Sequence, residues 1–488
     1  MPIPVETFFL DPSFEGTLQQ QIREFVAKGI LDGRYRPGEQ MPSSRKLAAH
    51  LGISRITVTL AYTDLVADDY LTSRGRSGYY VSENAPAAGR FEPPSARTSD
   101  TVDWARVLSH RISGGRHMQK PPNWRSFRYP FIYGQADESL FDHHNWRQCA
   151  LRALGQRDFE ALTTDYYERD DPKLVEFIAR HSLPRRGIIA RPEEILVTLG
   201  AQNALWTTAQ LLLSQRRTAV LENPGYPGLR EILAQSRCNV ASVDVDEDGL
   251  PPDAIPQGAD VVFVTPSHHC PTTATMPVER RRTLLKRAER DNFLVVEDDY
   301  EFEIAHQRPP TPALKSLDQS GRVIYIGSFS KSLFPGLRLG YVVGPEAFIR
   351  EARSLRATVL RHPPGHIQRT AAYFLSVGHY DALVRRMAQV FTRRRAVMEA
   401  EIRRHGLNAL ATSASGGSSF WLKAPASVNT RELADLLAGK EVLIEPGAVF
   451  FADDAPPDRY FRLAYSSITA DRIPEGIARV ARAIDALR

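Results

Sequence analysis

Ser328-Phe329-Ser330-Lys331, followed at a short distance by Arg338, is the stretch that decides the fold of this chain. It comes directly after the apolar run Val323–Ile326, which predicts a buried strand. In open α/β sheets, ligands bind at the carboxyl ends of the strands. A lysine amine there can form a Schiff base with an aldehyde, and hydroxyls with an arginine can hold a phosphate. The combination indicates a pyridoxal phosphate site on an α/β sheet.

Two other interpretations of the same stretch have to be weighed. Lys331-Ser332 resembles the end of a nucleotide P-loop, but the pattern G-x-x-x-x-G-K-[ST] needs glycine at 325 and 330, where the chain has Tyr325 and Ser330. An ordinary surface lysine after a strand stays open from the tetrapeptide alone.

Composition describes a globular chain without an obvious membrane or export segment. The 488 residues are 42% hydrophobic and 24% charged, values ordinary for a folded globular protein. We see no apolar run long enough to cross a bilayer and no basic and apolar leader at the N-terminus. Three scattered cysteines favour a reducing compartment, and we expect a cytoplasmic protein. His268-His269-Cys270 lacks a second ligand pair, so we expect no metal site.

The first eighty residues carry the pattern of a helix-turn-helix. An amphipathic helix is predicted over about 16–32, a second from Ser43 or Ser44 to Leu51, and a third that begins after Ser54. Gly52-Ile53 makes the short turn between the last two. A β-hairpin, or wing, is predicted around the turn 74–78.

Bulk charge does not identify a nucleic-acid partner, because residues 1–83 contain nine Lys or Arg and ten Asp or Glu, a balance of −1. The placement of the polar groups does point to DNA, since side chains at the start of the second helix of such a motif reach base edges. The residues that we expect to contact DNA are Ser43, Ser44, Arg45, Ser54, Arg55, Thr57, Arg74 and Arg76. A plain three-helix module with solvated charges is the alternative.

The stretches 37–48, 51–58 and 75–81 resemble the GntR-type winged helix of bacterial regulators. The resemblance covers about residues 12–83. It implies that double-stranded operator DNA is a partner.

The rest of the chain reads as a linker and an α/β body. We assign residues 1–83 to the winged helix, 84–104 to a linker rich in Ala, Pro and Ser, and 105–488 to the body, with a smaller α+β lobe over about 365–488. Short apolar strands alternate with helical segments in the body, which predicts a mostly parallel sheet covered on both faces.

Further polar groups follow these strands. Gly200-Ala201-Gln202 opens a helix after a strand, where free amides favour a phosphate. Glu297-Asp298-Asp299 ends another strand and offers either metal ligands or a carboxylate for a pyridinium nitrogen. We choose Asp298 for the second role, because strand alternation turns Asp299 and Glu297 to the other face. Tyr226 either stacks on a ring or packs under its loop.

Taken together, these positions resemble the fold-type I aminotransferases over roughly 105–488. The resemblance implies that Lys331 carries pyridoxal phosphate as an internal aldimine and that Asp298 pairs with the pyridine nitrogen. It further implies that Tyr300 binds the ring oxygen and that Arg462 binds the acidic group of a ligand. Stacking and phosphate binding fall to Tyr226, Ser328, Ser330, Arg338 and the amides of Gly200, Ala201 and Gln202.

One position departs from that family. Cys270 stands where many members have the asparagine of an N-P-T-G loop, and a thiol is a poor hydrogen-bond partner. This departure puts efficient transamination in doubt.

A GntR-type winged helix joined to such a body resembles the MocR subfamily of transcription regulators, and residues 3–10 and 75–81 resemble members that control taurine or ectoine-derivative use. The resemblance implies a head-to-tail homodimer in which an amino compound forms an external aldimine and changes DNA binding. Arginine two residues after the stacking tyrosine marks the γ-aminobutyrate-responsive members, and here that position is Gly228. An aminotransferase with an accessory DNA-binding module, and a cofactor-free regulator that uses the fold for dimerisation, are the alternatives.

Overall fold

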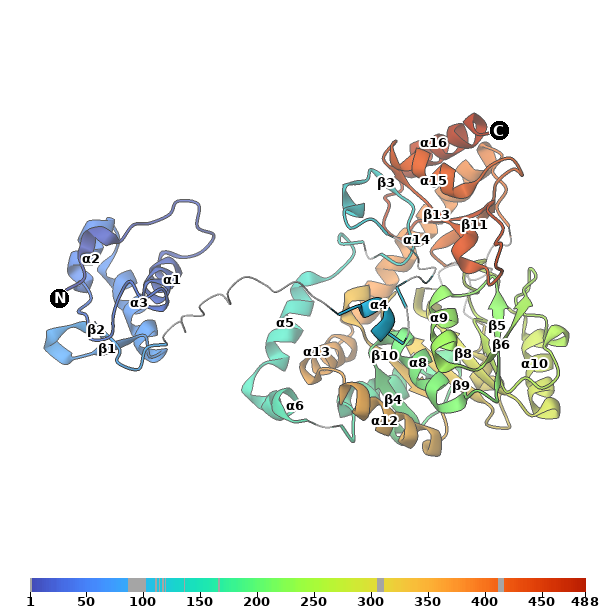
Figure 1. The fold of residues 1–488 in the computed structure, drawn as a ribbon, viewed down its shortest axis with the longest axis horizontal. Coiled ribbons are helices and arrows are strands. Elements are labelled where there is room, and N and C mark those ends of the chain that lie inside the picture. Colours follow the sequence, from blue (N-terminus) through green and yellow to red (C-terminus); the bar gives the residue numbers. More distant parts are fainter. Residues whose placement is uncertain are drawn as a thin grey trace. The chain divides into compact units, whose positions relative to one another are not determined.

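A computed structural model describes residues 2–86, 102–109, 112–113, 115, 118, 120–135, 137–165, 167–304, 311–410 and 417–488 of the chain. Its contacts divide the chain into two compact units, Met1–His110 and Arg111–Arg488 (Figure 1). Most of the predicted linker lies outside the described residues.

The N-terminal unit contains the three predicted helices and the wing. The helices are α1 (Leu18–Leu31), α2 (Ser44–Leu51) and α3 (Arg55–Ala67), and the wing is formed by β1 (Leu71–Ser73) and β2 (Tyr79–Val81), which pair antiparallel. Single-turn helices cover Val5–Thr7 and Gly75–Ser77, and α4 covers Trp104–Val107. The unit has a hydrophobic core of its own, with side chains from all three helices and both strands.

Capping residues set where these helices begin and end. Thr17 forms a capping box with Gln20, Ser43 accepts a hydrogen bond from the amide of Lys46, and Ser54 accepts one from the amide of Ile56. Gly52 ends α2 in the left-handed region, at φ +66°, a conformation that glycine adopts without strain.

A seven-stranded sheet in the described part of the second unit carries the body. The strands are β4 (Ile195–Thr198), β5 (Thr218–Asn223), β6 (Asn239–Asp244), β7 (Val261–Val264), β8 (Leu294–Asp299), β9 (Val323–Ser328) and β10 (Gly340–Val343), in the order β4-β10-β9-β8-β7-β5-β6. Pairing is parallel from β6 to β9, whereas β10 runs antiparallel to both of its neighbours. The carboxyl ends of β4, β5, β7, β8 and β9 therefore meet at one edge.

Helices cover both faces of this sheet, as the alternating pattern predicts. On one face, α8 (Gly200–Leu212), α9 (Pro227–Ser236) and α12 (Glu346–Leu360) enclose an apolar cluster. The other face packs against α10 (Val278–Asp291), α11 (Leu314–Leu317), α5 (His143–Ala153), α7 (Pro172–Phe177) and α13 (Gly365–Ser376). The short helix α6 covers Phe159–Thr163.

A smaller α+β lobe follows. Its antiparallel sheet has the order β11 (Ser419–Lys423), β14 (Tyr460–Ala464), β13 (Glu445–Pro446), and its helices are α14 (His379–Arg404), α15 (Thr430–Ala438) and α16 (Ile473–Ala486). A strand from far earlier in the chain, β3 (Tyr129–Pro130), joins this lobe by parallel pairing with β12 (Val442–Leu443). The amide of Phe131 donates to the carbonyl of Leu443 at 2.9 Å, and the amide of Ala464 donates to the carbonyl of Phe131 at 3.1 Å. The lobe thus includes a segment that precedes the large sheet.

None of the helices in the described ranges has the length and apolar character needed to cross a membrane.

Candidate functional sites

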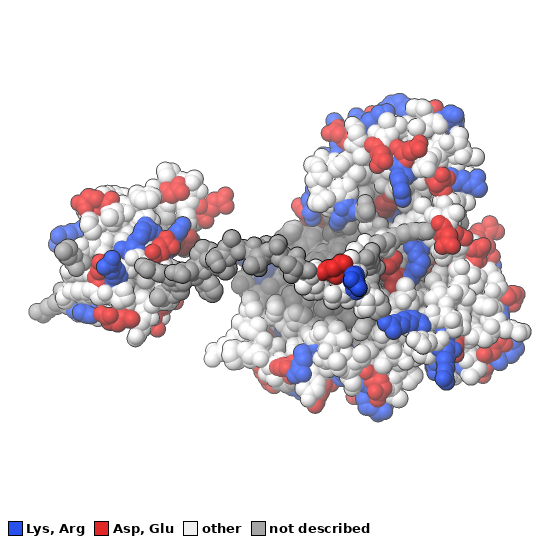
Figure 2. All heavy atoms as spheres, in the orientation of Figure 1, with Lys and Arg blue, Asp and Glu red and all other residues white. Residues whose placement is uncertain are grey.

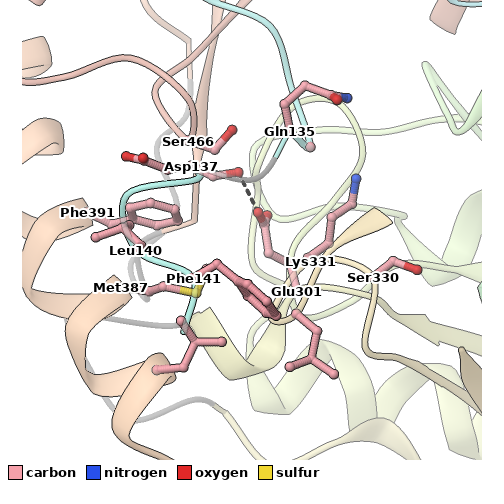
Figure 3. Close-up of a pocket in the computed structure, with 14 residues that line it drawn as sticks. Gln135, Asp137, Leu140, Phe141, Glu301, Ser330, Lys331, Met387, Phe391 and Ser466 are labelled. Atoms are coloured by element: carbon pink, nitrogen blue, oxygen red, sulfur yellow. Dashed lines mark hydrogen bonds between the residues drawn. The ribbon is translucent and has the colours of Figure 1, made fainter. Parts of the chain in front are cut away.

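Lys331 lies in the turn after β9, in a pocket between the large sheet and the small lobe (Figure 3). Its Nζ is 4.3 Å from the centroid of the Tyr133 ring. Gly134 leaves room for the amine, because a Cβ at that position would lie 2.1 Å from Nζ. Burial lowers the pKa of Lys331 to about 8, although the charge of Glu301 opposes this shift. A lysine of this kind is partly neutral near physiological pH and is suited to nucleophilic chemistry.

An anion cradle lies at the start of α8. Gly200 begins the helix at φ +78°, and a Cβ at this position would lie 3.5 Å from Nη2 of Arg338 and 3.6 Å from Oγ of Ser330. Ser328, the last residue of β9, accepts the amide of Ser330 at 3.2 Å. Helix-terminal amides, a hydroxyl and a guanidinium therefore converge on one point, as a phosphate group requires.

The three consecutive carboxylates of β8 have three different environments. Glu297 accepts the amides of Leu314 and Lys315, each at 2.8 Å, and so caps α11. Asp299 forms a buried ion pair with Arg186, at 2.6 Å. Asp298 lines a separate small cavity, and its Oδ1 has no hydrogen-bond partner among the described residues.

Burial and the neighbouring charge of Asp299 raise the pKa of Asp298 to about 7. A buried carboxylate oxygen without a partner is costly unless a donor reaches it. Within the described ranges, no group of three or more His, Cys, Asp or Glu side chains is arranged to hold a metal ion.

Tyr226 and Asp298 line the same cavity. Tyr226 lies at the start of α9, and its hydroxyl donates to Oε1 of Gln202 at 2.6 Å. A Cβ at Gly228 would lie 2.6 Å from that oxygen and 2.7 Å from the Tyr226 ring, so no larger residue fits there without moving the ring. Tyr300 follows β8 and lies edge-on to His268, with 6.0 Å between ring centroids.

Cys270 is buried, and burial raises the pKa of its thiol to about 11, which keeps it protonated. Its amide donates to Oγ1 of Thr265 at 3.3 Å, and that hydroxyl donates to Oε2 of Glu222 at 2.6 Å. The loop that carries the cysteine is therefore held by its backbone and by Thr265.

Arg462, on β14, already has an acidic partner. Its Nε lies 2.8 Å from Oε2 of Glu445, and its guanidinium carbon lies 4.1 Å from the centroid of the Tyr133 ring. Because Lys331 contacts the same ring, Tyr133 joins the amine and the guanidinium. Nε of the guanidinium contacts Glu445, and Nη2 donates to Sδ of Met118 at 3.4 Å, a weak bond that an acidic ligand could replace.

The residues of this site fit pyridoxal phosphate. Asp298 presents an unpartnered buried oxygen as a pyridinium nitrogen requires, Gly200 brings the start of α8 close to Arg338 and Ser330, and Lys331 presents a partly neutral amine. All are at the carboxyl edge of the sheet.

Sequence reasoning missed several residues of the pocket. Tyr133, Gly134 and Glu445 carry no motif, and they come from segments far from Lys331 in the chain. Glu301 did carry a signal, because it directly follows Tyr300 at a strand end, but it was not singled out.

The predicted DNA-contacting residues lie on α2, α3 and the wing. Arg45, Arg55 and Arg74 are exposed. Ser43 and Ser54 are N-caps, Thr57 is half-buried, and Ser44 accepts a 3.4 Å hydrogen bond from Nε of Arg55. The side chain of Arg76 lies outside the described part.

The acidic end of α3 is tied to α1. Asp64 accepts Nε2 of Gln19 at 2.7 Å, and Asp68 pairs with Arg23 at 2.8 Å. Figure 2 shows acidic and basic side chains side by side on this unit. Any electrostatic preference of this unit for DNA therefore depends on where its individual basic side chains lie, because its net charge is close to zero.

Comparisons with known proteins agree with the predicted identity of both units of the chain. Residues 18–81 match the bacterial regulatory proteins of the gntR family, and residues 137–480 match the aminotransferase class I and II family. The chain is 57% identical to the HTH-type transcriptional regulator TauR of Rhodobacter capsulatus, over 99% of this chain and 100% of that one. It is 30% identical to the probable rhizopine catabolism regulatory protein MocR of Rhizobium meliloti, over 98% and 96% of the two chains.

The chain belongs to the MocR-type transcription regulators of the GntR family. As in the resemblance drawn from the sequence, a regulator's DNA-binding domain is joined here to an aminotransferase-like body.

Solved structures establish the fold of that MocR-type body. A Pyrococcus horikoshii kynurenine aminotransferase gives a TM-score of 0.70 at 23% identity, over 79% of this chain and 98% of that one. LysN, an α-aminoadipate aminotransferase of Thermus thermophilus, gives 0.71 at 24% identity, over 79% and 99%. The prediction of a winged helix joined to a fold-type I aminotransferase body is confirmed.

Proposed function

We propose that this MocR-type regulator binds pyridoxal phosphate at Lys331 and changes its DNA binding when an amino compound with an acidic group enters the pocket. The cofactor, when bound, supplies an aldehyde carbon that condenses with a primary amine. Support also comes from the solved structure of LysN, which was complexed with N-(5'-phosphopyridoxyl)-L-leucine.

One observation carries this proposal: Oδ1 of Asp298 is buried without a partner among the described residues, in a cavity that Tyr226 also lines. An apolar or paired residue would be expected at such a position in a body that served only for dimerisation. When the cofactor is bound, Asp298 would accept a hydrogen bond from the protonated ring nitrogen, and the positive charge of the ring would balance the negative charge of the carboxylate.

The chain's own residues divide the work of recognition. Lys331 presents its amine, Ser328, Ser330, Arg338 and the amides of Gly200, Ala201 and Gln202 hold the phosphate, Tyr226 stacks on the ring, and Tyr300 binds the ring oxygen. Arg462 receives the acidic end of the effector through its two Nη atoms. Because Arg462 belongs to the small lobe and Lys331 to the large sheet, an effector that contacts both favours one arrangement of the lobes.

The pocket restricts the effector class. Position 228 is a glycine, so this chain does not carry the second arginine that marks γ-aminobutyrate-responsive members. Amino compounds with one acidic group, sulfonates included, are the candidates.

The proposal extends to the assembly. Residues 1–83 form the DNA-binding domain, 84–104 the linker and 105–488 the sensing body with its small lobe at about 365–488. Two chains form a head-to-tail dimer, which reads repeated half-sites on DNA.

Spectroscopy with DNA binding tests the proposal. Purified protein is expected to absorb as a cofactor bound to lysine, and Lys331→Ala is expected to remove that band. A screen of amino carboxylates and amino sulfonates should find a compound that shifts the band and also changes binding to DNA from upstream of the protein's own gene. Protein without such a band, or a band that Lys331→Ala leaves in place, contradicts the cofactor site. Sustained multiple-turnover transamination with a keto acid contradicts the sensor role and favours an enzyme.

A further inference from the structure

A second buried carboxylate, in addition to Asp298, interacts with Lys331. Glu301 is 4% exposed and lines the same pocket as Lys331 (Figure 3). Asp137 also lines that pocket, but it is paired with Arg394. No lysine or arginine in the described part of the chain lies within ion-pair distance of Glu301.

Glu301 is held by both parts of the body. The hydroxyl of Ser418, directly before β11 of the small lobe, donates to Oε1, as the dashed line in Figure 3 marks. His268, in the loop after β7 of the large sheet, places Nε2 at 2.8 Å from Oε2. Gly417 packs closely on that histidine, since a Cβ there would lie 2.2 Å from the ring. The carboxylate therefore connects the loop over the large sheet with the first strand of the small lobe.

This carboxylate is charged at neutral pH. Burial alone would raise the pKa of Glu301, but the neighbouring His268 and the hydrogen bond from Ser418 lower it below its ordinary value. Other groups that face Lys331 are Arg462, Cys270, Glu445, Asp298 and Tyr133, and burial keeps the pKa of the Tyr133 phenol well above its ordinary value. Among them Glu445 is paired with Arg462, and Cys270 stays protonated.

We propose that Glu301 binds the effector's amino group as an ammonium ion and, through Ser418, couples its arrival to the small lobe. An alkylamine enters from water in its charged form, and a charge in a buried pocket needs a counter-charge. Glu301 supplies that counter-charge in the pocket that Lys331 also lines.

The exchange of the Lys331 amine for the effector's amine conserves both atoms and charge. With the cofactor bound, its aldehyde carbon would exchange one nitrogen for another: the bond to the effector's nitrogen forms, and the bond to Nζ of Lys331 breaks. The protons that the effector's ammonium loses end on the nitrogen of Lys331, which leaves as an ammonium ion. The net charge opposite Glu301 is the same before and after the exchange, so the carboxylate stays ionised throughout.

The inference rests on the proposed function, and Glu301→Gln tests it with methylamine as the probe. In protein that shows the lysine-bound cofactor band, the variant should need about tenfold or more methylamine for a half-maximal spectral change at pH 7, the size expected for loss of a charged hydrogen bond. The difference should shrink at high pH, where the amine is neutral. Equal midpoints at pH 7, or a difference that does not depend on pH, overturn the proposal.

Glu303→Gln controls for replacing a buried glutamate outside this pocket, and because burial raises the pKa of Glu303 to about 8, this variant tests packing and not the loss of a charge. Absence of the cofactor band from wild-type protein would contradict the proposed function instead. Failure of the Glu301 proposal and failure of the proposed function are therefore distinguishable.

A cofactor-free readout follows the charge of Glu301 directly. Acetylation of Lys331, measured by mass spectrometry across pH, should show a midpoint at lower pH in Glu301→Gln than in wild type, because the carboxylate raises the pKa of the amine. An unchanged midpoint overturns the contact between the two groups.

Ser418→Ala tests the coupling. It should leave the methylamine midpoint within about threefold, because the charge is retained, but remove the methylamine-induced change in hydrogen exchange of β11. Wild-type exchange behaviour in Ser418→Ala overturns the coupling step.

Discussion

Individual side chains at the end of β8 differ in function because of the groups that they contact. Glu297 caps a helix, Asp299 pairs with Arg186, and Asp298 keeps an oxygen without a partner in the described part of the site. Side chains alternate between the two faces of a strand, so Asp298 points to the opposite face from Glu297 and Asp299. For this reason the sequence alone was enough to prefer Asp298 as the carboxylate for a ring nitrogen.

Asparagine substitutions should separate these roles. Asp299→Asn removes one partner of a buried ion pair and is expected to cost about 3–5 kcal/mol of unfolding free energy in urea denaturation. Asp298→Asn removes no hydrogen bond or ion pair between described residues, so stability should stay within about 1 kcal/mol while the cofactor's spectrum and affinity change. A spectrum identical to wild type in Asp298→Asn would mean that another carboxylate faces the ring.

The Lys331 amine makes the stability of cofactor-free protein depend on pH. Its pKa is about 8 in the folded chain and 10.5 in the reference state, so between these values the unfolded chain binds more protons and stability rises with pH. Below pH 8 the group opposes folding by at most about 3 kcal/mol.

Lys331→Met should therefore gain most in stability relative to wild type at pH 6–7, and the gain should fall as pH approaches 10. Urea unfolding of the two cofactor-free proteins at several pH values measures how this difference changes with pH, and pH-independent packing effects do not contribute to that change. A constant difference across pH would contradict an enclosed, partly neutral amine.

Gly228 leaves no room for a methyl group. Gly228→Ala should displace Tyr226 or Gln202 and weaken cofactor binding about tenfold, because the stacking ring moves. Equilibrium dialysis of the cofactor measures the loss. Gly336→Ala is a control, since nothing described lies within 4 Å of a Cβ at that position; equal losses in both would contradict the steric explanation.

At the scale of elements, helices with caps were the most predictable. Ser54 and the pair Ser43-Ser44 predicted the starts of α3 and α2, and the observed N-caps are Ser54 and Ser43. The N-cap of α1, Thr17, was not predicted, although the helix itself was. The strand β10 was not predicted, since its short apolar run after the Lys331 loop indicates neither a separate strand nor its antiparallel direction. The pairing of β3 with β12 joins residues more than 300 positions apart, and local pattern holds no information about such contacts.

Arg55, at the start of α3, and Arg23, on α1, form a matched pair of exposed arginines. Arg55→Ala is expected to weaken operator binding by about 1–3 kcal/mol and to reduce the salt dependence by about one phosphate contact if the residue contacts the backbone. Arg23, on α1, is also exposed but is paired with Asp68, so Arg23→Ala should leave DNA affinity near wild type. Fluorescence anisotropy at several salt concentrations measures both. Equal affinities for all three proteins would remove α3 from the interface.

At the scale of the molecule, each unit has its own apolar core. The winged helix should therefore fold when produced alone as residues 1–86. If the body supplies the dimer, that fragment should bind a DNA site with two half-sites at least about a hundredfold more weakly than the full chain, because the second contact is no longer intramolecular. Gel-shift titration compares them, and equal affinity would contradict the role of the body in assembly.

The path of the chain gives β3 a further significance. Following the chain from the winged helix, the first strand in the described part of the body is β3, and it pairs with β12 of the small lobe before the large sheet begins. Three residues beyond it, Tyr133 lies against both Lys331 and Arg462. The chain therefore enters the body through the small lobe, the lobe that carries Arg462, before it forms the large sheet.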